Sequence, residues 1–108
     1  MSESQEKIQQ LQTIEQSLQQ MMKPRQQLQV QLMEITSAQE ELKKTDKAYR
    51  IISNIMVAAE KAPLDKELTE KKVRVELRIK SIEKQENTLK EQAKTLREDI
   101  MKTMQKKQ

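Results

Sequence analysis

The side chains of this sequence that could do chemistry are almost all carboxylates and amines. Its 108 residues include 21 Lys and Arg and 17 Asp and Glu, but no His, Cys or Gly. Without His and Cys the chain lacks the commonest general base, the usual thiol nucleophile and nearly all zinc ligands. Without Gly it has no glycine-rich phosphate loop. The sequence therefore predicts a protein that is not an enzyme and needs no cofactor and no metal.

The basic groups are the next candidates, as a nucleic-acid surface. Residues 1–44 carry five basic and six acidic groups, whereas residues 65–108 carry thirteen basic and nine acidic ones, and the net charge is +4. Lys and Arg alternate with Glu throughout, and a single aromatic ring leaves little to stack on bases. A solvated helix face with i,i+4 ion pairs is favoured over nucleic-acid binding.

The location of the protein is constrained only by composition. The start, MSESQEK, lacks the apolar core of a secretory signal, and no run is long enough to cross a bilayer. We therefore expect a cytoplasmic protein that does not engage a membrane.

Two regular apolar stripes must position these polar groups. Only 34% of the chain is apolar, which is too little for a globule of this size but fits long helices or a coiled coil. In each half, one set of residues recurs with gaps that alternate between three and four, as in a coiled-coil seam. The first seam is Leu11, Ile14, Leu18, Met21, Arg25, Leu28, Leu32, Ile35, Gln39 and Leu42. The second seam is Leu68, Lys72, Val75, Ile79, Ile82, Glu86, Leu89, Ala93, Leu96 and Ile100.

Two seams of equal length around a short connector predict an antiparallel coiled-coil hairpin with arms of about 60 Å. Ser2 and Gln5 fit a capping box for the first arm, and Asp65 is the expected cap of the second. We expect a single domain, residues 1–108, with a first helix over 1–44, a central hairpin and linkers over 45–64, and a second helix over 65–108.

Pro24 breaks the helical pattern of the first arm, and two charged seam residues are close enough to pair. Pro24 removes a backbone hydrogen bond and is expected to kink the first helix or to mark a frayed outer segment. Arg25 and Glu86 occupy seam positions that fall within about one layer of each other when the arms pair. We expect these two residues to form an ion pair that sets the register at some cost in stability.

The centre of the chain, AYRIISNIMVAAEKAP, departs from the helical pattern. It is compatible with a continuous helix, but its β-branched and aromatic residues favour strands, and Ser53-Asn54 is a plausible two-residue turn. A β-hairpin is therefore preferred. Because an isolated hairpin is marginally stable, its apolar surface would have to be covered by other chains. The surface residues are Tyr49, Ile51, Ile52, Ile55, Met56 and Val57.

These features together resemble the β-class subunit of prefoldin. AYRIISNIMV resembles the strand–turn–strand segment of that family, DKELTEK the start of its second helix and SIEKQENTLKE its second arm, from about Gln20 onward. A connector of about 20 residues has room for one hairpin, whereas the α-class has two. Family turns usually carry a glycine near Ser53, which this chain replaces with Ser53-Asn54.

The resemblance implies an ATP-independent chaperone. Its hairpin would join an intersubunit β-barrel in a hexamer with α-class and further β-class subunits, and it would deliver unfolded clients to a cytosolic group II chaperonin. Clients would be held at the tips of the coiled coil, where methionines suit varied contacts. The candidate client-binding residues are Ile8, Leu11, Ile14, Met22, Ile100, Met101 and Met104. Those on the seams could instead only close the hairpin.

Two alternatives stay open at this stage. The terminal Lys102, Lys106 and Lys107 could contact the chaperonin, or could serve only to balance the helix dipole and aid solubility. The whole chain could instead be a structural coiled-coil adaptor that binds no unfolded client. The adaptor predicts a continuous helix through the central segment, or a parallel dimer.

Overall fold

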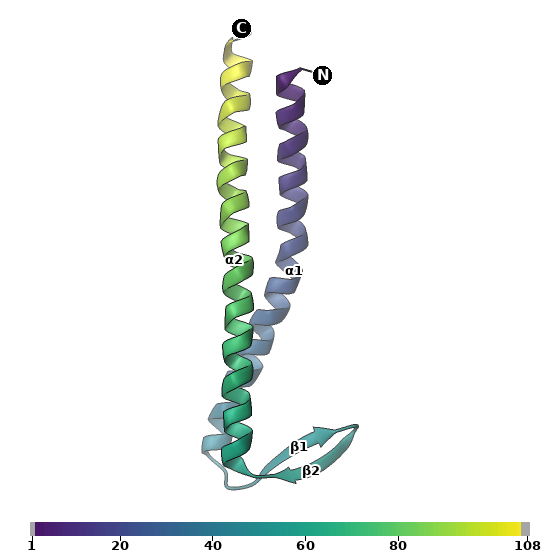
Figure 1. The fold of residues 1–108 in the computed structure, drawn as a ribbon, viewed down its shortest axis with the longest axis vertical. Helices are drawn as coiled ribbons and strands as arrows, with labels where there is room; N and C mark the ends of the chain where they lie inside the picture. The colour runs from purple at the N-terminus through teal and green to yellow at the C-terminus, as the bar shows by residue number, and fades with distance from the viewer. Residues whose placement is uncertain (1, 107–108) are drawn as a thin grey trace. The chain divides into compact units, whose positions relative to one another are not determined.

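The protein consists of two long helices joined by one short β-hairpin. The computed structural model describes residues 2–106. Helix α1 spans Glu3–Lys43, strand β1 spans Ala48–Ile52, strand β2 spans Ile55–Ala59 and helix α2 spans Lys61–Lys106 (Figure 1). The prediction of a mainly helical coiled-coil hairpin with a central β-hairpin is thereby confirmed.

The chain divides into two compact units, and both helices contribute to each. The terminal unit comprises Met1–Gln26 and Lys80–Gln108, and the hairpin unit comprises Gln27–Ile79. In the terminal unit, the beginning of α1 and the end of α2 lie side by side and run in opposite directions (Figure 1). In the hairpin unit, the two strands follow the end of α1 and precede the start of α2.

The two predicted seams are the buried stripes of the helices. All ten positions of each seam are buried or half-buried, including the polar ones. In the hairpin unit, a core forms around three buried side chains, against which Leu28, Leu32 and Leu68 pack. The three buried core residues are Ile35, Val75 and Ile79. The 3–4 spacing therefore located the buried side chains without an error.

The start of the first helix is as predicted, and the start of the second is not. The backbone N–H of Gln5 donates to Ser2 Oγ at 3.3 Å, and the backbone N–H of Ser2 donates to Gln5 Oε1 at 3.2 Å, which is a complete capping box. Helix α2, however, begins at Lys61, so the prediction that Asp65 caps it is wrong. Pro63 lies in the first turn of α2, where its missing N–H would have no helical partner in any case.

The proline of the first helix also does not end it. Helix α1 is continuous on both sides of Pro24, so this residue does not mark a frayed segment. The terminal unit ends two residues later, at Gln26. Close to Pro24, the predicted ion pair is present inside the terminal unit, with Arg25 Nε 2.8 Å from Glu86 Oε1. The Glu86 side chain is buried and the Arg25 side chain is about one-quarter exposed.

The central hairpin has the expected turn. Strands β1 and β2 pair antiparallel, with Ile52 opposite Ile55. Ser53 and Asn54 both have positive φ, 47° and 68°. Two consecutive positive φ values are what a type I′ turn requires, and its twist suits a two-residue hairpin. The missing glycine therefore does not prevent the hairpin, because Ser53 and Asn54 both adopt the left-handed region.

Candidate interaction surfaces

The hairpin exposes apolar side chains on both of its faces. Because side chains alternate along a strand and paired residues share a face, the register separates two sets. One face carries Tyr49, Ile51, Met56 and Ala58, and the other carries Arg50, Ile52, Ile55 and Val57. Six of these eight are large apolar or aromatic side chains that are 41–72% exposed. Both faces therefore need a covering that the described part of this chain does not supply.

One hydrogen-bonded ion pair ties the hairpin to the second helix. Arg50 Nη2 donates to Glu67 Oε1 at 2.7 Å and to Glu67 Oε2 at 2.8 Å. Both side chains are about half exposed, so the pair contributes orientation more than stability. Sequence analysis missed it because the partners are 17 residues apart and meet only once the strand and the helix are in place.

The predicted tip residues separate into two groups in the terminal unit. Leu11 and Ile14 are half-buried and Ile100 is buried, as expected for seam positions. The remaining four lie off the seams and are exposed: Ile8 by 41%, Met22 by 46%, and Met101 and Met104 each by 61%. Closing the hairpin therefore leaves these four apolar side chains available to another molecule.

These exposed residues lie toward one side of the helix pair. Glu15 and Arg97, which each directly follow a seam residue, form an ion pair of 3.1 Å across the seam. Ile8 lies one heptad before Glu15, and Met104 lies one heptad after Arg97, so the same pairing places Ile8 opposite Met104. Met101 lies one helical turn before Met104. We call Ile8, Met101 and Met104 the apolar tip patch.

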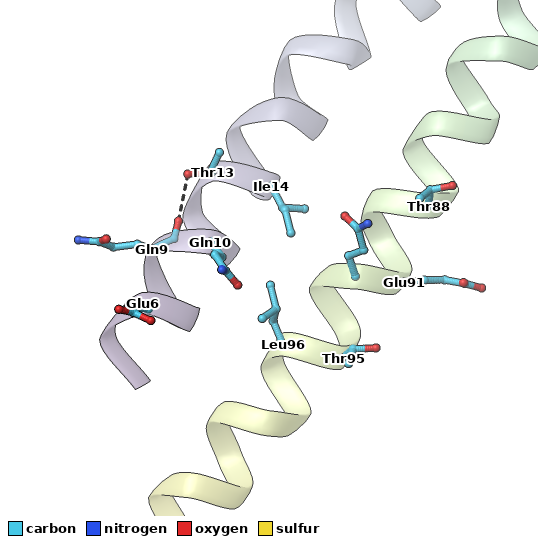
Figure 2. A pocket seen from close by; sticks show the side chains of 10 residues that line it. Glu6, Gln9, Gln10, Thr13, Ile14, Thr88, Glu91, Thr95 and Leu96 are labelled. Atoms are coloured by element: carbon cyan, nitrogen blue, oxygen red, sulfur yellow. Dashed lines mark hydrogen bonds between the residues drawn. The ribbon is translucent and has the colours of Figure 1, made fainter. Parts of the chain in front are cut away.

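The other side of the terminal unit carries a groove of about 930 Å³, whose lining residues are mostly of polar type although most of the surface exposed inside it is apolar. Figure 2 shows Ile14 and Leu96 extending into the space between the helices, with Gln10 beside them and Glu6 and Glu91 at the edges. Gln10 and Gln92 each directly precede a seam residue, whereas Glu15 and Arg97 each directly follow one. Residues before and after a seam position lie on opposite sides of the seam, so the groove and the Glu15–Arg97 ion pair are on opposite sides of the helix pair. We call it the polar groove; its lining residues are Glu6, Gln9, Gln10, Thr13, Ile14, Thr88, Glu91, Gln92, Thr95 and Leu96.

The basic C-terminal residues are only partly described. Lys102 is exposed on α2, Lys106 is the last residue of that helix, and Lys107 lies outside the described residues.

Sequence analysis also missed four exposed apolar residues of the hairpin unit, because they lie off the seams among polar neighbours. These four are Val30, Met33, Val73 and Leu77.

Neither a metal site nor a membrane span is found in residues 2–106. No group of three or more acidic side chains there lies close enough together to hold a metal ion. Helices α1 and α2 are long, but neither contains a stretch apolar enough to span a bilayer.

The chain is a two-helix coiled-coil hairpin that carries one uncovered β-hairpin, an architecture suited to a subunit of an oligomer. Comparison with known proteins identifies its family. The model of the prefoldin subunit family matches residues 5–107. The prefoldin subunit beta of Archaeoglobus fulgidus is 40% identical over 87 residues, which cover 78% of this chain and 75% of the relative. The prefoldin subunit beta of Thermococcus onnurineus is 33% identical over 94 residues, covering 84% and 81%.

A solved structure gives the same result. The crystal structure of the prefoldin beta subunit from Thermococcus strain KS-1 matches with a TM-score of 0.88 and 28% identity, covering 95% of this chain and 93% of that one. The chain therefore belongs to the prefoldin subunit family, and the resemblance to the β-class is confirmed. Membership implies a chaperone subunit that assembles with other prefoldin subunits.

Proposed function

We propose that this chain is a subunit of an ATP-independent holdase that captures unfolded proteins at the tip of its coiled coil. In this proposal it occupies β-class places in a cytosolic hexamer with α-class subunits and passes its clients to a group II chaperonin. The observation that carries the proposal is the apolar tip patch. It stays exposed although both seams are closed, and two of its three members are methionines.

The chemistry of the patch suits clients of varied sequence. Methionine is unbranched and polarizable, so it adapts to many apolar shapes without a fixed pocket. Met22, on the same side of α1, extends the exposed apolar surface away from the tip. Leu11, Ile14 and Ile100 contribute beneath it by holding the two helices together and would reach a client only when the tip opens.

The hairpin supplies the assembly surface in this proposal. Its uncovered side chains on two faces and its unpaired strand edges are the features that strand addition from other subunits would satisfy. A β-barrel built from several hairpins would bury one face in its interior. The strand pair supports this proposal over one form of the adaptor alternative, the form with a continuous helix through the central segment.

In this proposal the chaperonin contact is assigned to Lys102, Lys106 and Lys107. Three lysines near the end of α2 would be attracted to an acidic surface. They would also stabilise the negative end of the helix dipole without any partner. Binding to a chaperonin that weakens steeply with salt, and weakens further in a triple Lys→Gln variant, would support the contact.

Light scattering tests the client-binding step. A chemically unfolded protein is diluted into buffer without nucleotide, in the presence of this chain, an α-class prefoldin subunit, or both. We expect aggregation to be suppressed only when both subunits are present. Suppression should fall several-fold when Met101 and Met104 are replaced by Ser, because the client then no longer buries the apolar surface of two methionines.

The hairpin unit offers a matched control for this experiment. Met33 and Leu77 are also exposed, by 70% and 61%, and also lie off the seams. Met33→Ser with Leu77→Ser removes comparable apolar surface from α1 and α2 and should leave suppression unchanged. Equal losses in the two double variants would contradict a tip site, and unchanged aggregation by a confirmed hexamer would overturn client binding altogether.

A further inference from the structure

The polar groove of the terminal unit is not used by the apolar contacts proposed above. It lies on the opposite side of the helix pair from the Glu15–Arg97 ion pair, whose side the apolar tip patch shares. Its residues from Glu6 to Ile14 extend for about 12 Å along α1, at 1.5 Å per residue. That length matches about four residues of an extended chain.

The lining of the groove provides hydrogen-bonding groups that have no partner of their own. The side-chain amides of Gln10 and Gln92 form no hydrogen bond with another described residue. Each amide offers both donors and an acceptor, as a peptide main chain does. The hydroxyls of Thr13 and Thr88, at the margins of the groove, already donate to backbone carbonyls of their own helices, at 3.0 and 3.1 Å, so the two amides are its principal free hydrogen-bonding groups.

The charge of the groove favours a basic ligand. Among the described residues that line it, only Glu6 and Glu91 are charged, and neither forms an ion pair with another described residue. The chain as a whole has a net charge of +4, so this acidic lining runs against its overall charge. Two open carboxylates on opposite helices attract Lys or Arg side chains.

We propose that the polar groove binds a short, extended segment of an unfolded protein that carries lysine or arginine. The main chain of the segment hydrogen-bonds to the amides of Gln10 and Gln92, and its basic side chains approach Glu6 and Glu91. Ile14 and Leu96 contact the aliphatic stems of those side chains. This inference rests on the proposed function and adds to it a second, polar client site.

Peptide binding to the 108-residue chain, measured by fluorescence anisotropy, tests the groove directly. The ligand is a labelled peptide of about eight residues, enough to span the groove, in which Lys alternates with Gly and Ser. A second peptide has Glu in place of Lys. We expect the basic peptide to bind, with an affinity that falls as salt is added, and the acidic peptide not to bind.

Two variants of equal charge change separate the groove from general electrostatic attraction. Glu6→Gln with Glu91→Gln should weaken binding of the basic peptide about fivefold, the loss expected for two exposed ion pairs. Glu70→Gln with Glu98→Gln changes two exposed glutamates outside the groove and should leave the affinity unchanged. Gln10→Ala with Gln92→Ala should weaken binding of the same peptide without any change of charge.

Several results would overturn the groove proposal. The first is that the basic peptide does not bind. The second is that both double glutamate variants weaken binding of the basic peptide equally. The third is that a photo-crosslinker at Thr95 captures only a second copy of this chain. If aggregation is still suppressed through Met101 and Met104 in any of these cases, the proposed function stands and only the groove site falls. If suppression is lost as well, both proposals fail.

Discussion

The two units of this protein use the same helical repeat for different purposes. In the hairpin unit, branched apolar side chains form a buried core around Ile35, Val75 and Ile79. In the terminal unit, the seam contains an ion pair between the half-buried Arg25 and the buried Glu86, and a small buried residue, Ala93. The difference teaches that a regular seam does not imply uniform packing: the helices of the hairpin unit share a branched apolar core, whereas those of the terminal unit also meet at a charged layer.

The largest expected effect comes from truncating the apolar core of the hairpin unit. Ile35 and Ile14 occupy equivalent seam positions three heptads apart, but Ile35 is buried and Ile14 is half-buried. Ile35→Ala should lower the free energy of unfolding by about 3 kcal/mol, because it removes buried methyl groups and leaves a cavity. Ile14→Ala should cost about 1 kcal/mol, since its site is already partly hydrated.

Urea unfolding of the two variants, followed by circular dichroism, measures this contrast. Assembly with other subunits raises apparent stability, so both variants are compared at the same protein concentration and in the same oligomeric state. Equal losses in Ile35→Ala and Ile14→Ala would mean that the two units are packed alike, and the comparison between them would fail.

A smaller effect tests the charged layer of the terminal unit. Arg25→Leu should cost about 2 kcal/mol, because it leaves the buried Glu86 carboxylate without its close partner. Replacing both residues by Leu should recover that loss and add about 1 kcal/mol, since a matched apolar pair avoids the desolvation of two charges. The double variant would make this part of the terminal unit resemble the hairpin unit.

Thermal unfolding of the single and double variants decides this point, and cross-linking reports the register of the helices. If the ion pair sets register, the more stable double variant should also form cross-links one heptad away from those of the unchanged chain. Loss of stability in the double variant would show that Arg25 and Glu86 stabilise the terminal unit outright. If the unchanged chain and the double variant both form cross-links in one and the same register, the ion pair does not set the register.

Sequence reasoning succeeded where the signal is periodic and local. The 3–4 spacing identified all twenty seam positions, and the same spacing predicted that Arg25 and Glu86 meet. Ser2 and Gln5 were recognised because a capping box is written within four residues. The hairpin followed from β-branched residues around a pair that tolerates positive φ.

Sequence reasoning failed where the signal depends on tertiary pairing or has two local meanings. Residues 45–64 were all assigned to the hairpin and linkers, but Pro63 is favourable in a first helical turn, so the start of α2 was placed four residues too late. The polar groove was missed because Gln10 and Gln92 look like solvated residues until the two helices lie side by side. The Arg50–Glu67 ion pair was missed because it depends on the direction in which the hairpin leaves the helices, which the sequence does not show.

The smallest expected effect lies in the turn of the hairpin, the part of the hairpin unit that its apolar core does not stabilise. Ser53 and Asn54 hold positive φ, which costs most residues about 1 kcal/mol and glycine almost nothing. Ser53→Asn with Asn54→Gly creates the preferred type I′ pair and should stabilise the strands by about 1 kcal/mol. Amide hydrogen exchange in β1 and β2 should then slow about fivefold while exchange in the terminal unit is unchanged. Ser53→Val, whose branched side chain resists positive φ, should have the opposite effect on the same amides. Slower exchange in both units would instead mean that the turn stabilises the whole chain, and the two units would then unfold as one.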